Sequence, residues 1–206
     1  MPSADLRAAI SSAPMSAVLL ALNLTVFVAV NIEGRLLDVF SLPPDWAGLL
    51  QQPWTVLTVF FTADAFVHIA VAILVIGLFG GKLERIAGSV QVLMVYLLAG
   101  LAGSLALVAT AAVTAVDEPS VGASAAFLGL VGALAVCPRD AQGDELAVGK
   151  IVVVIVVLQL VAPALGIGDW ASSAAHLAGL AVGAAYAYLL LRRKATGEVR
   201  APLSKG

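Results

Sequence analysis

Residues 170–191 read WASSAAHLAGLAVGAAYAYLLL, and these twenty-two residues contain no lysine, arginine, aspartate or glutamate. A helix needs about 20 predominantly apolar residues to cross the hydrocarbon core of a bilayer, with a range of roughly 17–25. This stretch is therefore long enough to span a membrane. It also contains a histidine followed by two glycines, so it bears on function as well as on fold.

The composition of the whole chain leads to the same class of protein. Of its 206 residues, 61% are hydrophobic and 12% are charged, whereas a soluble domain carries roughly 25% charged residues. Such a chain cannot cover a globular surface with polar groups, which excludes a soluble enzyme, a nucleic-acid-binding protein and a disordered chain. The formal net charge of -2 offers no basic surface for phosphates. The single Cys137 excludes an internal disulfide framework and a multi-cysteine metal site.

Charged residues divide the rest of the chain into further uncharged stretches of similar length. With the first one, they cover residues 8–32, 65–81, 86–116, 119–138, 151–168 and 170–191. We expect six transmembrane helices near residues 15–33, 65–81, 89–113, 121–137, 151–167 and 171–192. Residues 46–63 are also uncharged, but two glutamines and a proline interrupt them, so they are not counted as a span. The prediction is an all-α polytopic membrane protein, because a bilayer requires each backbone amide to be satisfied within its own segment.

The predicted membrane domain covers residues 15–192, with a large outer loop at about 34–64 and cytoplasmic tails at 1–14 and 193–206. Six spans put both termini on one side, and that side carries ten of the eleven lysines and arginines, all except Arg35. The positive-inside rule then predicts cytoplasmic termini in a multi-pass protein of the cell membrane. The tryptophans fall at the outer edge, which they favour. They are Trp46, Trp54 and Trp170. The apolar composition of the outer loop predicts that it lies in the membrane interface.

Three polar side chains inside the predicted spans are candidates for function, because ionisable residues are costly in a bilayer and are usually functional there. The only two histidines, His68 and His176, fall near the outer starts of the second and sixth helices, and Ser124 falls near the outer start of the fourth. At 1.5 Å per residue, all three lie roughly 5–10 Å below the outer surface. Three helices thus bring histidine, serine and histidine to one depth.

These residue types suit nucleophilic catalysis. A serine becomes a nucleophile when a histidine within hydrogen-bond reach takes its proton, and a nearby donor stabilises the resulting oxyanion. Ser124 as nucleophile, His176 as general base and His68 as a second oxyanion donor fit these roles. Glycines beside the serine and the second histidine would let the fourth and sixth helices approach closely. These glycines are Gly122, Gly129, Gly132, Gly179 and Gly183.

Each of these residues also has a structural interpretation. Serine is common in membrane helices as a packing residue, small residues spaced by four usually serve helix packing, and a buried histidine can be structural. Metal binding by the two histidines lacks an evident third ligand, so we expect neither a metal nor a cofactor. The occurrence of both histidines and the serine at one depth favours a catalytic site.

Four segments of the chain, spread over about residues 50–190, resemble the rhomboid family of intramembrane serine proteases in order and topology. Residues 122–126, GASAA, resemble its GxS nucleophile motif, and residues 175–183, AHLAGLAVG, resemble its AHxxGxxxG motif. The other two segments are the second helix from His68 to its exit GGKLERIAGS at 80–89, and PWTVLT at 53–58, which is similar to the end of the large first loop.

The resemblance implies a rhomboid-like six-helix bundle with a Ser124–His176 dyad and no third acidic member. It implies that backbone N–H groups of Ser124 and Ala123, together with the His68 side chain, bind the oxyanion. The substrates would be transmembrane segments of other proteins, cut near their outer end after entering past the fifth helix at 151–167. No nucleic-acid partner is expected, and the oligomeric state is left open.

The chain departs from the family pattern at several positions. Ala72 stands four residues after His68, where the family commonly has asparagine, and Thr55 follows the loop tryptophan in place of arginine. Leu128 stands where an aromatic residue usually follows the serine. Loss of one oxyanion donor can cost about 10²–10³ in rate. Two alternatives therefore remain: a weak or inactive rhomboid-like protein that binds transmembrane clients, and a small transporter. The transporter is disfavoured because no charged residue falls at the predicted midplane.

Overall fold

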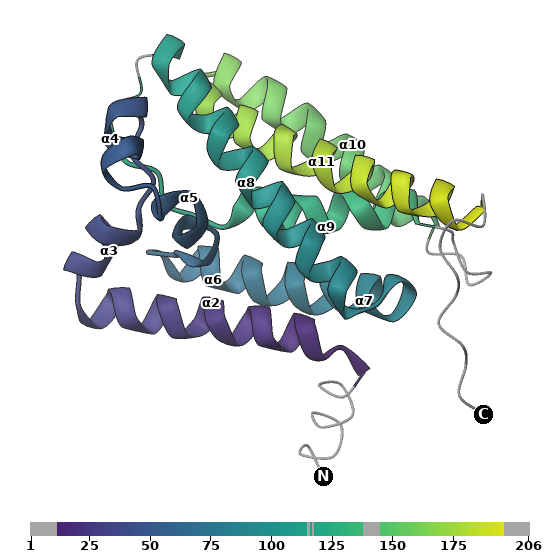
Figure 1. Cartoon of the computed structure of the whole chain (residues 1–206). Coiled ribbons are helices and arrows are strands. Elements are labelled where there is room, and N and C mark those ends of the chain that lie inside the picture. Colours follow the sequence, from purple (N-terminus) through teal and green to yellow (C-terminus); the bar gives the residue numbers. More distant parts are fainter. Residues whose placement is uncertain (1–11, 115, 117, 138–144, 196–206) are drawn as a thin grey trace.

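The computed structural model describes residues 12–114, 116, 118–137 and 145–195, and these residues are predominantly helical. They form no strand beyond one isolated antiparallel bridge between Leu42 and Ser120, which confirms the all-α class. Figure 1 shows long helices packed into a bundle with several short helices at one end. Residues 1–11 and 196–206 of the predicted tails lie outside the described part of the chain.

Six longer helical segments occupy the described residues at the positions of the predicted spans. They are α2 (Pro14–Ile32), the run α6 (Phe66–Leu74), η2 (Val75–Gly80) and α7 (Gly81–Ala87), α8 (Ser89–Thr114), α9 (Ser124–Val136), α10 (Glu145–Ala164) and α11 (Trp170–Ala195). By length and composition, α2, the run Phe66–Ala87, α8 and α11 can each cross a membrane, whereas the apolar helices Ser124–Val136 and Val148–Ala164 are shorter. The structure therefore supports four candidate spans, and the count of six stays a prediction.

The second predicted helix, residues 65–81, is too short. The observed run continues through a π-helical turn, Val75–Gly80, into α7, and it ends at Gly88, where φ is 96° and an L side chain would be strained. The charges of residues 82–85 suggested an end to the helix. Glu84 is nevertheless buried, because four hydrogen bonds satisfy its carboxylate.

The fourth and fifth helices also begin at places that the uncharged stretches did not indicate. The fourth was predicted from residue 121, but α9 begins at Ser124, because Gly122 has a φ of 138° that no helix contains. The chain before it is extended and pairs with the outer loop, with Leu42 N donating to Ser120 O at 2.9 Å and Ser120 N donating to Leu42 O at 2.8 Å. The fifth begins at Glu145 instead of residue 151, so Lys150 lies within α10.

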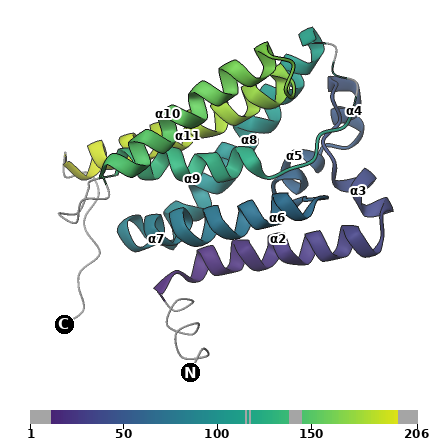
Figure 2. The same cartoon turned by 180° about the vertical axis from the view of Figure 1, so that it is seen from behind.

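The predicted outer loop, residues 34–64, is largely helical. It contains α3 (Arg35–Phe40), α4 (Trp46–Gln51), α5 (Thr55–Thr58) and a 3-10 turn, η1 (Val59–Phe61). Figures 1 and 2 show α3, α4 and α5 gathered at one end of the bundle, whereas α2 starts and α11 ends at the other. Trp46, Trp54 and Trp170 are 46–47% exposed, so the rest of the protein covers about half of the surface of each residue.

The centre of the bundle is a close contact of α8, α9 and α11. A Cβ on Gly129 would overlap the side chain of Ala99 on α8, and a Cβ on Gly179 or Gly183 would overlap the backbone of α9 at Ala125 or Gly129. Only glycine permits this approach without displacing a helix. The contact fixes α11 against the first turns of α9, and it is this packing that positions the candidate site.

Candidate active site

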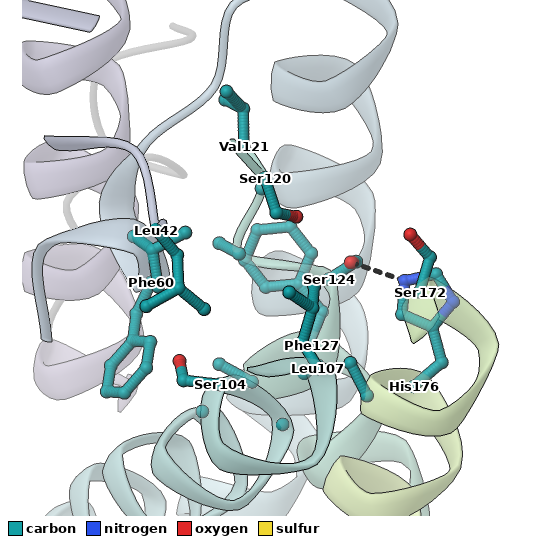
Figure 3. Close-up of a pocket in the computed structure, with 18 of the residues that line it drawn as sticks. Leu42, Phe60, Ser104, Leu107, Ser120, Val121, Ser124, Phe127, Ser172 and His176 are labelled. Atoms are coloured by element: carbon teal, nitrogen blue, oxygen red, sulfur yellow. Dashed lines mark hydrogen bonds between the residues drawn. The ribbon is translucent and has the colours of Figure 1, made fainter. Parts of the chain in front are cut away.

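Ser124 and His176 come from different helices and are in direct contact. Ser124 Oγ lies 2.6 Å from His176 Nε2, although the two residues are 52 positions apart in the chain. Figure 3 shows the serine on α9 and the imidazole on α11 directed toward each other. Both side chains are half-buried. A hydroxyl can donate to an unprotonated ring nitrogen at this distance, so the geometry allows the imidazole to take the serine proton.

Ser124 is the first residue of its helix, and this position follows from the turn before it. Gly122, with a φ of 138°, keeps the preceding residues out of the helix, and Ala123 precedes the first helical residue. The first N–H groups of a helix have no intrahelical acceptor and carry partial positive charge. The amides around Ser124 therefore suit an anion beside its hydroxyl. Gly122 was predicted to pack between helices, but it lies outside α9, and a Cβ there would meet only Ser124 Oγ, at 3.9 Å. It shapes the turn instead.

The serine and both histidines line one cavity of about 310 Å³. Most of its other lining side chains are apolar or small. They come from the outer loop (Leu42, Val59, Phe60, Ala63), α6 (Val71), α8 (Gly100, Gly103, Ser104, Leu107), residues 120–127 and α11 (Ser172, Ala175). Its volume lies at the low end of the range for ligand pockets. The cavity can therefore place a small group of a ligand against the Ser124 hydroxyl (Figure 3).

His68 contributes to this cavity from α6 but is placed differently from His176. Its side chain is 48% exposed, and its Nδ1 lies 2.8 Å from Asp64 Oδ1, one turn earlier in the chain. Asp64 thereby orients the ring, and because a carboxylate only accepts, Nδ1 carries the hydrogen of this pair, so Nε2 donates to a bound group only when the ring is an imidazolium. Among the described residues, no group of three or more histidine, cysteine or acidic side chains could hold a metal ion.

The positions that depart from the family pattern do not open onto the cavity. Ala72 is 1% exposed, within the core of the bundle. Thr55 is fully buried, and its Oγ1 donates to Gln52 O at 2.6 Å. Phe127 lines the cavity in place of an aromatic residue at 128, and its ring centroid lies 6.2 Å from that of Tyr96. An aromatic side chain is thus present at the site, one position earlier than the pattern suggests.

Several residues around the site were not found from the sequence. Tyr96 Oη donates to the carbonyl of Phe60, a residue that lines the cavity from the outer loop, and Asn23 Nδ2 donates to Tyr96 Oη at 3.0 Å. This buried network fixes η1 against α8 and α2. A polar residue such as Asn23 in the middle of a span was a usable signal, but its partner lies 73 positions away, and sequence spacing does not reveal such a contact.

Comparison with known proteins finds one matching family model and two related plant proteins. A family model described as Rhomboid domain matches residues 50–193. Among curated proteins of Arabidopsis thaliana, RHOMBOID-like protein 6, mitochondrial, is 27% identical over 157 residues, which cover 74% of this chain and 49% of that protein. RHOMBOID-like protein 4 is 27% identical over 151 residues, which cover 72% of this chain and 37% of that protein. The chain thus spans half or less of the length of these relatives.

Proposed function

Because this chain belongs to the rhomboid family, we propose that it is an intramembrane serine endopeptidase that cleaves transmembrane segments of other proteins near their outer end. The observation that carries this proposal is the 2.6 Å contact between Ser124 Oγ and His176 Nε2. The cavity of about 310 Å³ beside that contact supports it, because a scissile carbonyl needs room next to the nucleophile.

The proposed reaction uses the side chains in this order. Ser124 Oγ attacks the scissile carbonyl while His176 Nε2 takes its proton, and His176 then returns the proton to the leaving amine. Water hydrolyses the acyl-enzyme in a second step, with the same histidine as base. The oxyanion is bound by backbone N–H groups of Ser124 and Ala123 and by Nε2–H of His68 in its imidazolium form, whose Nδ1–H is held by Asp64. No metal or cofactor takes part.

The same proposal includes a membrane topology. All six longer helices cross the bilayer of the cell membrane, with α9 completed by the extended residues 119–123 that precede it. Both termini are cytoplasmic, and the cavity opens to the outer side. The distribution of lysine and arginine supports this orientation. The half-exposed tryptophans at the end of the bundle formed by α3, α4 and α5 support it independently.

A fluorophosphonate probe tests the proposal directly, because it labels only a serine whose hydroxyl is activated by a base. We expect the wild type in detergent or proteoliposomes to be labelled, and Ser124→Ala and His176→Ala to remain unlabelled. A single-span substrate in the same proteoliposomes should be cleaved by the wild type alone. Equal labelling of all three proteins would show that Ser124 and His176 are not the reactive pair.

A second candidate function is the binding of transmembrane clients without cleavage. It is favoured by Ala72, which removes a side-chain donor common in the family, and by the pairing of His68 with Asp64 instead of with the nucleophile. This function predicts that single-span proteins co-purify intact with the wild type and that the probe labels none of the variants. Labelling of the wild type together with release of a cleavage product would exclude it.

A further inference from the structure

The two ring nitrogens of His176 have different surroundings. Nε2 lies 2.6 Å from Ser124 Oγ. Nδ1 is buried, and it has no hydrogen-bond partner among the described residues. A neutral imidazole carries one proton, so an Nε2 that accepts from Ser124 requires the hydrogen on Nδ1. The base therefore presents a buried N–H without an acceptor, and this deficit grows when the ring becomes an imidazolium during the reaction.

A possible acceptor for this N–H is the hydroxyl of Ser172, which lies one helical turn before His176 on α11. Asp169 precedes the helix, and both of its carboxylate oxygens are used by one residue. Ser172 N donates to Asp169 Oδ1 at 2.7 Å, and Ser172 Oγ donates to Asp169 Oδ2 at 2.7 Å. A hydroxyl has one proton and two lone pairs. Because that proton is committed to Asp169, Ser172 Oγ can only accept from any further partner.

Ser172 and His176 are separated by four residues and therefore lie on the same face of α11. Both line the cavity, and Figure 3 shows both side chains on the cavity side of α11. The other polar side chains that line the cavity come from other elements. They are His68 of α6, Ser104 of α8, and Ser120 and Ser124 of the segment leading into α9. Ser172 is thus the acceptor that shares a helix face with the base.

Few charged groups surround this pair. The helices α8 and α9 carry no charged residue. The other titratable side chain lining the cavity is His68, which is paired with Asp64. On α10, the charged residues are Glu145 and Lys150, both near the start of that helix. Asp169, just before α11, is therefore the charged residue nearest to His176 along this part of the chain, and Ser172, to which it is hydrogen-bonded, lies between the two in sequence.

We propose that Ser172, oriented by Asp169, is a positioning residue that accepts a hydrogen bond from Nδ1–H of His176 when the imidazole takes the Ser124 proton. The inference rests on the proposed protease function. It replaces a two-membered site with a chain of contacts from Asp169 through Ser172 and His176 to Ser124. No proton moves beyond His176: the hydroxyl of Ser172 keeps its own proton on the side of Asp169 and stabilises the charged ring.

The test compares Ser172→Ala with Ser172→Thr, which keeps the hydroxyl. We expect Ser172→Ala to lower kcat about tenfold with little change in KM, because the acceptor acts on the charged ring and not on substrate binding. The acid limb of its pH–rate profile should move to lower pH, since an imidazolium that has lost an acceptor forms less readily. Ser172→Thr should retain most of the wild-type rate and the wild-type acid limb.

Ser173→Ala is a matched control. Ser173 is buried, donates to Gln159 Oε1 at 3.0 Å and does not line the cavity. Its loss should leave the pH–rate profile in place. The inference is overturned if Ser172→Ala matches the wild type, if Ser172→Thr is as impaired as Ser172→Ala, or if Ser173→Ala shifts the acid limb equally. A purely structural role of Ser172 would lower activity without moving that limb.

A measurement without turnover separates this inference from the proposed function. In His68→Gln, His176 is the only histidine, so ¹⁵N-histidine spectra report on its ring alone. Its titration midpoint should fall when Ser172→Ala is added, and an unchanged midpoint would refute the hydrogen bond. Absence of both cleavage and probe labelling in the wild type would instead refute the protease function, whatever the spectra of these variants show.

Discussion

The Glu84 cluster and the Ser124–His176 pair, two of the groups of polar side chains within the bundle, differ in how completely their hydrogen bonds are satisfied. The Glu84 cluster (Met15, Ser16, Glu84 and Ser89) joins α2, α7 and α8. In it the buried carboxylate accepts from Met15 N and Ser16 N at 2.8 Å, from Ser16 Oγ at 2.7 Å and from Ser89 Oγ at 2.6 Å. The Ser124–His176 pair has one hydrogen bond at 2.6 Å, an unpartnered Nδ1 and a cavity beside it.

This difference suggests that the Glu84 cluster serves stability, whereas the Ser124–His176 pair serves the proposed reaction. A buried carboxylate with its lone pairs occupied costs little to keep and ties three helices together. A serine and an imidazole that face a cavity are available to a ligand, and their remaining hydrogen-bonding capacity can serve the proposed reaction. We therefore expect substitutions in the Glu84 cluster to act on the free energy of unfolding and substitutions at the Ser124–His176 pair to act on turnover.

The largest expected effect is on cleavage by Ser124→Ala. Removal of the nucleophile should lower the rate about 10⁴-fold or more, whereas the free energy of unfolding should change by no more than about 1 kcal/mol. Cleavage of a single-span substrate in proteoliposomes and unfolding in mixed micelles measure the two quantities. A cleavage rate within tenfold of the wild type would contradict the assignment of the nucleophile.

Gly179→Ala should give the next largest effect, because it forces apart the helices that bring the pair together. Its Cβ would overlap the backbone of Ala125, so we expect a loss of about 3 kcal/mol or more in unfolding free energy. Activity should fall as well, since Ser124 adjoins Ala125. Gly149→Ala on α10, where a Cβ meets nothing within 4 Å, is the control and should be neutral or slightly stabilising. Equal stability of the two variants would disprove the close contact.

Glu84→Ala should cost about 3 kcal/mol of unfolding free energy, because it leaves the buried backbone donor of Ser16 and the half-buried one of Met15 without an acceptor. The rate of cleavage per folded molecule should stay near that of the wild type. Probe labelling counts the folded, reactive molecules, and the measured cleavage rate is divided by that number. Glu33→Ala is the control, because Glu33 is exposed. If Glu84→Ala abolished labelling of fully folded protein, the separation between the two clusters would fail.

The smallest effect is expected for Ser89→Ala, the counterpart of Ser124→Ala in the Glu84 cluster. It removes one of four hydrogen bonds to the carboxylate, so the unfolding free energy should fall by about 1.5 kcal/mol. Cleavage should be unchanged. The two serine variants should thus have opposite effects. Ser124→Ala should lose turnover and keep its stability, whereas Ser89→Ala should lose stability and keep its turnover. A pattern in which both variants lose turnover would argue against two independent clusters.

The sequence predicted the helical class and the positions of the six longer helical segments, because long uncharged stretches have few other ways to satisfy their backbone in a membrane. It also selected Ser124 and His176, which the structure brings into contact. It did not predict where α9 begins, since the stretch 119–138 has no charge to mark a boundary and the helix start depends on the conformation of Gly122.

Contacts between distant segments were likewise beyond the sequence. Glu84 looked like the end of a helix because its partner Ser16 lies 68 positions away. The helical content of the outer loop was missed because short helices such as α3 and α5 contain too few residues to show a periodicity. Ser172 was overlooked because serine is common in membrane helices, and only the structure shows that it is bound to Asp169 and lines the same cavity as His176.

The bridge between Leu42 and Ser120 has a consequence for the order in which parts of the protein fold. Its two hydrogen bonds hold the segment that leads into Ser124, and they connect parts of the chain separated by two long helical segments, Phe66–Ala87 and α8. Contacts of such wide sequence separation close late, since the intervening chain must first be brought together. If the chain is the proposed protease, a partly inserted chain therefore lacks the bridge in front of Ser124, and it becomes able to hydrolyse a peptide bond only when the domain is complete.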